Sequence, residues 1–264
     1  TGAFASQLGF YGGSTAITGG IDLRVNAGGL ALTGGAANAF AQVGHGGRGI
    51  AHPDIDADIS VIFDEAGALV LSSGTGGSSY TQIGHGGANS NGNYEGDVTI
   101  LNAASLDLNA GSSGSGSQRY AQIGHGGVSS SPNEQARNRS GNFMIGVTGD
   151  ININGGANGD NSYAQIGHGG SGTASAATVA DLISGNIVLN VGGQLALAAN
   201  NTISSAGTYT QIGHGGRNYV SNKTGDISVV TGLLTTGGVS LTGGAEDVAS
   251  RFSQIGHGGT LSGA

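Results

Sequence analysis

The chain of 264 residues contains no cysteine and no tryptophan, and it has only two prolines. Without cysteine it can form no disulfide, no zinc–thiolate site and no cysteine nucleophile. Lys and Arg contribute eight residues, which form no run, against sixteen Asp and Glu. Because nucleic-acid binding depends on cationic contacts to phosphates, we expect no nucleic-acid partner. No apolar run is long enough to span a bilayer, so we expect no direct membrane insertion.

Glycine is the residue that the chain has in excess, with 56 copies, far above the usual share. These glycines follow no Gly-X-Y period, which excludes a collagen helix. Hydrophobic residues make up 37% of the chain and recur regularly. Such recurrence argues against disorder, since a disordered chain lacks the apolar residues that build a core.

One eight-residue motif organises the chain. The sequence Tyr-Thr-Gln-Ile-Gly-His-Gly-Gly at 80–87 recurs in close variants at 40–47, 120–127, 163–170, 209–216 and 252–259. A degenerate copy at 5–13 has Phe10 in place of the histidine. A period of 40 to 46 residues indicates a repeat architecture, either a solenoid or a propeller.

Each repeat carries three short segments in which apolar and polar residues alternate, for example 98–100, 106–108 and 121–123. Alternation with a period of two predicts half-buried strands, and no segment sustains a helical period. The segments that follow each Gly-Gly vary in length and contain both prolines, Pro53 and Pro132. We therefore expect them to be loops that leave the scaffold after the Gly-His-Gly-Gly corner.

These features predict an all-β fold, a right-handed parallel β-helix (β-solenoid) of about seven coils with three short strands per coil. A β-propeller is the alternative, but its blades need four antiparallel strands and tight hairpins, for which the signals are missing. We interpret 1–264 as a single β-helix repeat segment and as an internal fragment of a longer repeat protein.

The histidines of the motif should stack in register as a structural ladder. Its members are His45, His85, His125, His168, His214 and His257. Each ring could hydrogen-bond to backbone or to the neighbouring ring, with the ladder pointing either inward or outward. Metal binding is the alternative, because neutral imidazole is a common ligand. Ligands along one line match tetrahedral geometry poorly, so we expect no metal there.

The aromatic and glutamine positions of the motif should lie on the outer face, since the Ile or Val of the motif points inward. They form the candidate ligand-binding site: Phe40, Tyr80, Tyr120, Tyr163, Tyr209 and Phe252, with Gln82 and Gln122. Aromatic rings pack against sugar faces and amides bond to hydroxyls, which favours polysaccharide. The alternative is a stack with a structural role only.

An acidic segment gives the single cofactor candidate. Asp54, Asp56 and Asp58 are spaced two residues apart, and clustered carboxylates can bind calcium. No glycine or distal glutamate completes an EF-hand pattern, so a solvated acidic loop is the alternative. We expect no other cofactor.

Catalytic groups are sparse, because Asp97, Asp150 and Asp226 are dispersed among repeats and no serine accompanies the motif histidine. We therefore expect no enzymatic activity and no catalytic residue. Two alternatives stay open: a polysaccharide-degrading β-helix lyase or hydrolase, and an ice-binding solenoid. For the latter, Thr81 and Thr210 do not make a regular threonine face.

Three segments carry a resemblance to a known family: Gly-Asp-Ile-Ser-Val at 225–229, Leu-Asp-Leu-Asn-Ala-Gly at 106–111 and Tyr-Ala-Gln-Ile-Gly-His-Gly-Gly at 120–127. Together they resemble the repeats of filamentous-haemagglutinin-like bacterial adhesins, the exoproteins of two-partner secretion, including the biofilm-matrix type. The resemblance covers nearly the whole chain.

The resemblance implies a stalk in a secreted protein at the bacterial cell surface or in the extracellular matrix, where it mediates attachment, aggregation or biofilm association. It implies extracellular polysaccharide or another cell-surface component as partner, and continuation of the same repeat array in the parent chain. It implies no catalytic residues.

Overall fold

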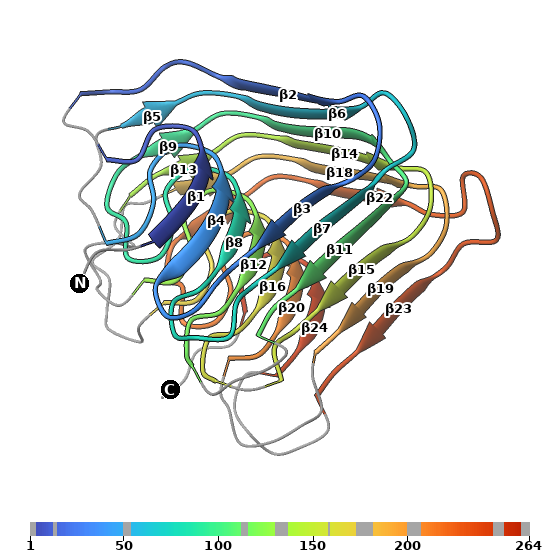
Figure 1. The fold of residues 1–264 in the computed structure, drawn as a ribbon. Helices are drawn as coiled ribbons and strands as arrows, with labels where there is room; N and C mark the ends of the chain where they lie inside the picture. Colours follow the sequence, from blue (N-terminus) through green and yellow to red (C-terminus); the bar gives the residue numbers. More distant parts are fainter. Residues whose placement is uncertain are drawn as a thin grey trace.

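The structure is a computed structural model that describes residues 4–12, 15–49, 54–111, 116–129, 137–157, 159–172, 182–199, 207–244 and 251–259. These residues form 24 β-strands in four parallel sheets and contain no helix, so no helix among them could cross a membrane. Figure 1 shows the strands of each sheet stacked in order along a coil. The predicted all-β parallel β-solenoid is confirmed.

The motif builds the sheet with the most strands, which we call the motif sheet. Its seven strands are β1 (Phe4–Leu8), β4 (Ala39–Val43), β8 (Thr81–Ile83), β12 (Ala121–Ile123), β16 (Ala164–Ile166), β20 (Thr210–Ile212) and β24 (Ser253–Ile255). Equivalent residues pair between neighbours, as Gln82 with Gln122 and Ile83 with Ile123. This in-register pairing turns each motif position into a column along the coil axis.

The other two predicted segments of each repeat form two six-stranded sheets. The β2 sheet contains β2 (Ile21–Val25), β6 (Ile59–Phe63), β10 (Val98–Ala103), β14 (Phe143–Val147), β18 (Ile187–Val191) and β22 (Ile227–Val230). The β3 sheet contains β3 (Leu30–Thr33), β7 (Ala68–Ser72), β11 (Ser105–Asn109), β15 (Ile151–Asn154), β19 (Leu195–Ala198) and β23 (Val239–Thr242).

A fourth sheet was not predicted, and the expectation of three strands per coil was wrong. It consists of β5 (Ile55–Asp56), β9 (Tyr94–Glu95), β13 (Arg139–Ser140), β17 (Leu182–Ser184) and β21 (Asn222–Thr224). Strands of two or three residues are too short to show alternation. They arise where the chain returns from the variable segments to the coil. Pro53 and Pro132, which belong to these segments, lie outside the described residues.

A complete turn therefore runs through four strands, for example β6, β7, β8 and β9 in chain order. The described residues form five complete turns, with β1 before them and β22, β23 and β24 after them. The predicted number of about seven coils counts the motif strands, and the two terminal turns are incomplete.

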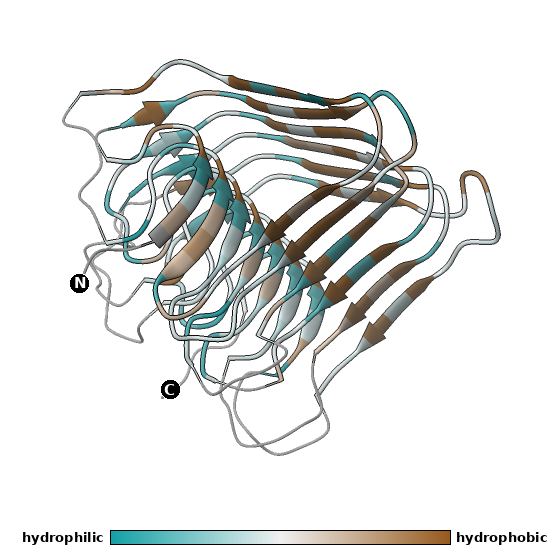
Figure 2. Ribbon diagram, in the orientation of Figure 1, coloured by the Kyte–Doolittle hydropathy of each residue, from teal (hydrophilic) through white to brown (hydrophobic). Residues whose placement is uncertain are grey.

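The core lies between the inner faces of the sheets, where side chains of one kind stack from coil to coil. Ile83, Ile123 and Ile166 are fully buried there, as predicted, together with Leu69 and Leu106. Full burial of one such side chain stabilises the fold by about 1.5–3 kcal/mol. Figure 2 shows hydrophobic residues at alternate positions of the β2 and β3 sheets, which matches this inward and outward alternation.

Candidate functional site

The corner after each motif strand requires glycine. Gly84 has a φ of +153°, and a Cβ at this position would overlap the carbonyl oxygen of Gly124 in the next coil. Only glycine combines this backbone conformation with so close an approach. The corner thus brings the backbones of successive coils together, and the polar side chains of the motif surround this contact.

The histidines form a continuous stack, with ring centroids 4.7 Å apart for His85 and His125 and 4.6 Å apart for His125 and His168. The Nδ1 of His125 accepts the backbone N–H of His85 at 3.0 Å. Because Nδ1 accepts, the ring proton lies on Nε2, which donates to the carbonyl oxygen of Gly96 at 2.8 Å. The other histidines of the stack repeat this pattern.

This arrangement supports the structural interpretation of the ladder. Four of the rings, those of His85, His125, His168 and His214, are fully buried, so the stack lies inside the molecule. Both nitrogens of each of these rings bond to backbone, and a metal ion would have to replace those bonds. The described residues contain no group of three His, Cys, Asp or Glu that could hold a metal ion.

Burial lowers the pKa of the inner histidines His85, His125, His168 and His214, because an imidazolium ion loses its hydration there. This desolvation lowers the pKa of His125 to about 4 and that of His214 to about 4. The pKa of His85 and that of His168 are also well below the usual value, first through desolvation and then through neighbouring histidines. These four rings are therefore neutral at physiological pH.

The motif glutamines hold the corner of the next coil. The Nε2 of Gln82 donates to the carbonyl oxygens of Gly124 and Gly126, both at 2.7 Å. Gln42, Gln122, Gln165 and Gln211 make the same two bonds, at 2.6 to 2.9 Å. Each amide bonds to two carbonyl groups of the corner in the next coil and helps to satisfy these buried acceptors.

The aromatic ladder exists, but the prediction that it lies on the outer surface was wrong. Tyr80 and Tyr120 stack with centroids 4.7 Å apart and planes at 4°, and both are fully buried. The residues that follow Gly87 and Gly127 lie over the rings, so that Ala88 and Val128 pack in the same cluster. The remaining members are Phe40, Tyr163 and Tyr209, which are buried, and Phe252, which is half-buried.

Burial removes these rings, and with them Gln82 and Gln122, from contact with a sugar in this conformation. The ladder instead forms a second apolar core behind the motif sheet. It is joined to the glutamines, since the hydroxyl of Tyr163 donates to Oε1 of Gln122 at 3.2 Å. The apolar residues Ala88 and Val128, directly after the Gly-Gly of two motif copies, were the feature of the sequence that could have predicted that the rings are covered.

The carboxylates of the predicted calcium candidate are spread along the chain at β5. Asp54 precedes this strand, Asp56 is in it and Asp58 comes after it, and in an extended chain residues two apart lie about 6.6 Å apart. Oδ1 of Asp54 accepts from the backbone and side-chain nitrogens of Asn93, and Oδ1 of Asp58 accepts the backbone N–H of Asp97. Asp54 and Asp58 thus bond to the next coil.

Sequence reasoning missed the cations of the fourth sheet. Arg139 is 1% exposed, lies over the ring of Tyr94 at 4.4 Å and donates from Nη1 to the carbonyl oxygen of Gly92. Lys223, in the same column, donates to two carbonyl oxygens, and burial lowers its pKa. Both side chains pack against a corner glycine, as their proximity to Gly126 and Gly215 shows.

Paired polar side chains lie on the outer face of the β3 sheet, on the neighbouring strands β11 and β15. There the Nδ2 of Asn152 donates to Oδ1 of Asp107 at 2.9 Å, and the Nδ2 of Asn154 donates to Oδ1 of Asn109 at 2.8 Å. These four side chains are half-buried or exposed and alternate with buried leucine and isoleucine. They present further amide and carboxylate atoms to solvent as two pairs, and Val70 and Ala196 flank the pair of Asp107 and Asn152 on the neighbouring strands.

No protein-family model, curated protein or solved structure matches this chain.

Proposed function

We propose that this chain is a stalk segment of a secreted, cell-surface adhesin of the filamentous-haemagglutinin-like type. The observation that carries the proposal is that the histidine, glutamine and tyrosine of the motif all bond or stack with neighbouring coils. A motif dedicated to holding coils together suits a rod that displays or spaces an adhesive surface. The resemblance of its segments to adhesin repeats supports the same conclusion.

Attachment would use extracellular polysaccharide or another cell-surface component as partner. The face that fits this role is the outer face of the β3 sheet, around Asp107, Asn109, Asn152 and Asn154. Its two pairs of amide and carboxylate groups lie on adjacent strands, about 4.8 Å apart. Such pairs can bond to the hydroxyl groups of a sugar chain without needing a deep cleft.

A binding assay tests this proposal. The purified protein is incubated with a panel of bacterial exopolysaccharides, with and without calcium, while bound protein and new chain ends are both measured. We expect binding without new chain ends, and we expect the double variant D107A/N152A to lose most of it. The control variant T99A changes the outer face of the β2 sheet and should bind normally.

The alternative function predicts a different result. A β-helix lyase or hydrolase would release new chain ends, and that result would refute the stalk proposal. Equal binding by D107A/N152A and the unchanged protein would reject the β3 face as the contact.

A further inference from the structure

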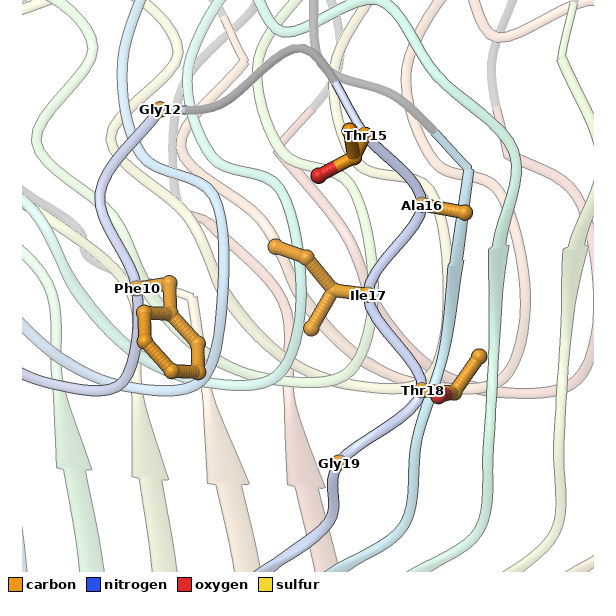
Figure 3. Close-up of a pocket in the computed structure, with 7 residues that line it drawn as sticks. All are labelled: Phe10, Gly12, Thr15, Ala16, Ile17, Thr18 and Gly19. Atoms are coloured by element: carbon orange, nitrogen blue, oxygen red, sulfur yellow. The ribbon is translucent and has the colours of Figure 1, made fainter.

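The outer faces of the sheets stay exposed however many coils the repeat array contains. The surfaces at the two ends of the coil differ in this respect. The pocket of about 360 Å³ beside Phe10 and Ile17, for example, lies in the first turn, where a preceding coil would cover it (Figure 3). In Figure 1 the β2 sheet forms the upper side of the coil, and no described strand lies over its outer face. A partner could therefore reach this face in an array of any length.

Two columns of side chains make up the outer face of the β2 sheet. The first column, which we call the Met144 column, contains Asp22, Ser60, Thr99, Met144, Val188 and Ser228. The second, which we call the Gly146 column, contains Arg24, Ile62, Leu101, Gly146, Asn190 and Val230. Because strand residues two apart point to the same side, members of the two columns lie side by side on every strand.

The middle of this face is apolar and uncharged. Met144 is 51% exposed, Val230 is 42% exposed, and Ile62, Leu101 and Val188 are half-buried. From β6 to β22, all of which the structure describes, the two columns contain no charged residue. The chain as a whole carries a net charge of −8. An uncharged apolar patch on an acidic rod is typical of a surface that binds another protein.

A projection and a hollow lie next to each other on this face. Met144 projects from β14, and Gly146, two residues further along the same strand, has no side chain. A pocket of about 200 Å³ opens there, lined among others by Gly146, Asn190 and Leu234. The face thus has both halves of a knob-into-hole contact on one strand.

We infer that two copies of this chain pair through the outer faces of their β2 sheets, as parallel rods related by a two-fold axis along the coil. This axis reverses the strand direction and keeps the order of the coils. The Met144 column of one copy therefore lies on the Gly146 column of the other, coil for coil. Met144 of each copy enters the pocket at Gly146 of the other, and the axis makes the contact twice.

The charges at the edge of the face agree with this arrangement. Asp22 of one copy lies opposite Arg24 of the other, since these two residues occupy the same coil in the two columns. Arg24 also donates to Asp64 of its own chain at 2.6 Å. Asp58, two residues before the Met144 column, lies opposite this Arg24–Asp64 pair, so Arg24 stands between the carboxylates of the two copies. A contact through any more acidic face would set like charges against each other.

The size of the face makes the pairing reversible. The six strands of the β2 sheet are four to six residues long. At about 3.3 Å per residue and about 4.8 Å per strand, the face measures about 400 Å² on each copy. The contact of about 800 Å² in total is smaller than the roughly 1,200 Å² of stable interfaces. Two segments of this length therefore associate weakly, and each further coil of the array would enlarge the contact.

Sedimentation equilibrium over a wide range of protein concentrations tests this inference. We expect a monomer that passes into a dimer as the concentration rises. G146M places a methionine opposite Met144 of the other copy, while within the chain its Cβ meets only Leu101 Cδ2 at 3.5 Å, an ordinary contact. M144A leaves the pocket at Gly146 unfilled. Each variant should raise the dissociation constant by about ten-fold or more.

A matched control changes the outer face of the β3 sheet. Ala31 is exposed there, and A31M adds the same side chain as G146M outside the proposed contact, so it should dimerise normally. Circular dichroism and thermal melting establish that each variant is folded. The test contains no polysaccharide, so its outcome is independent of the proposed adhesive role.

A mixing experiment tests the two-fold geometry itself. In a mixed pair, the introduced methionine of G146M lies opposite the alanine of M144A, and Met144 of G146M fills the pocket at Gly146 of M144A. The mixture should therefore form heterodimers more tightly than either variant forms homodimers. A protein that stays monomeric at all concentrations, a dimer that G146M does not weaken, or a mixture that associates no better than its components would overturn the inference.

Discussion

Acid should destabilise this fold through the histidine ladder. The Nδ1 of each inner histidine accepts a backbone N–H from the preceding coil, so a proton on Nδ1 would place two donors against each other. Protonation also creates a buried cation, to which nearby Arg139 adds repulsion at His125 and His168, and Lys223 at His214. The histidines therefore bind protons less readily in the folded state than in the unfolded chain.

The size of the effect follows from the pKa difference between the two states. The pKa of His125 and that of His214 are each about 4 in the fold, against about 6.5 in the unfolded chain. The unfolded state then binds more protons between these values, so stability is full above about pH 6.5 and is lost as the pH falls toward 4. At about pH 5.5 each of the two costs between about 1 and 2 kcal/mol, together about 3 kcal/mol.

Denaturant unfolding at about pH 7.5, 6.5 and 5.5 measures this loss, because side-chain carboxylates ionise mainly below that range. His85 and His168 shift in the same direction and should increase the loss. The matched variant H125N supplies an oxygen acceptor that does not titrate, so its stability should fall less steeply with pH. A free energy of unfolding that is flat between about pH 7.5 and 5.5 would refute the reasoning.

Three further variants test the coil-to-coil bonds by denaturant unfolding at neutral pH. Q122A leaves the carbonyl groups of Gly167 and Gly169 without their amide donor and should cost about 2–4 kcal/mol. Y163F removes the hydroxyl, with its bond to Gln122 and its backbone hydrogen bond at Ser171, and should cost about 1 kcal/mol, so a loss as large as that of Q122A would contradict the assignment. G84A should cost more than about 3 kcal/mol through strain and overlap, whereas G19A, with open space around the added Cβ, should stay within about 0.5 kcal/mol.

The stacking of the coils could be predicted because it depends on long-range repetition. Identical residues at a fixed period must occupy equivalent places, and alternation then assigns Ile83 and Ile123 to the core. The columns of His, Gln and aromatic residues follow from the same step. The positions of these columns, on strands or at corners, could therefore be predicted from the sequence.

The environment of the aromatic ladder could not be predicted in this way. Alternation assigned Tyr80 and Tyr120 to the face opposite the core, and this part was correct. Whether that face meets water depends on where the irregular chain after Gly-Gly runs, which no period encodes. The fourth sheet was missed for a related reason, because its pairing depends on how this irregular chain returns to the coil.

The motif is constant from coil to coil, whereas the residues of the fourth sheet vary. This contrast indicates why some residues of the chain repeat and others do not. A glutamine amide that bonds two carbonyl groups of the next coil has no substitute of equal reach and geometry, so it recurs in every copy. The column of Ile55, Tyr94, Arg139, Ile183 and Lys223 only has to fill space and satisfy its own polar atoms, and many side chains can do so. Strict repetition of a polar residue therefore marks a bond between coils, and a ligand site on such a rod is better sought among the outward positions that differ from coil to coil.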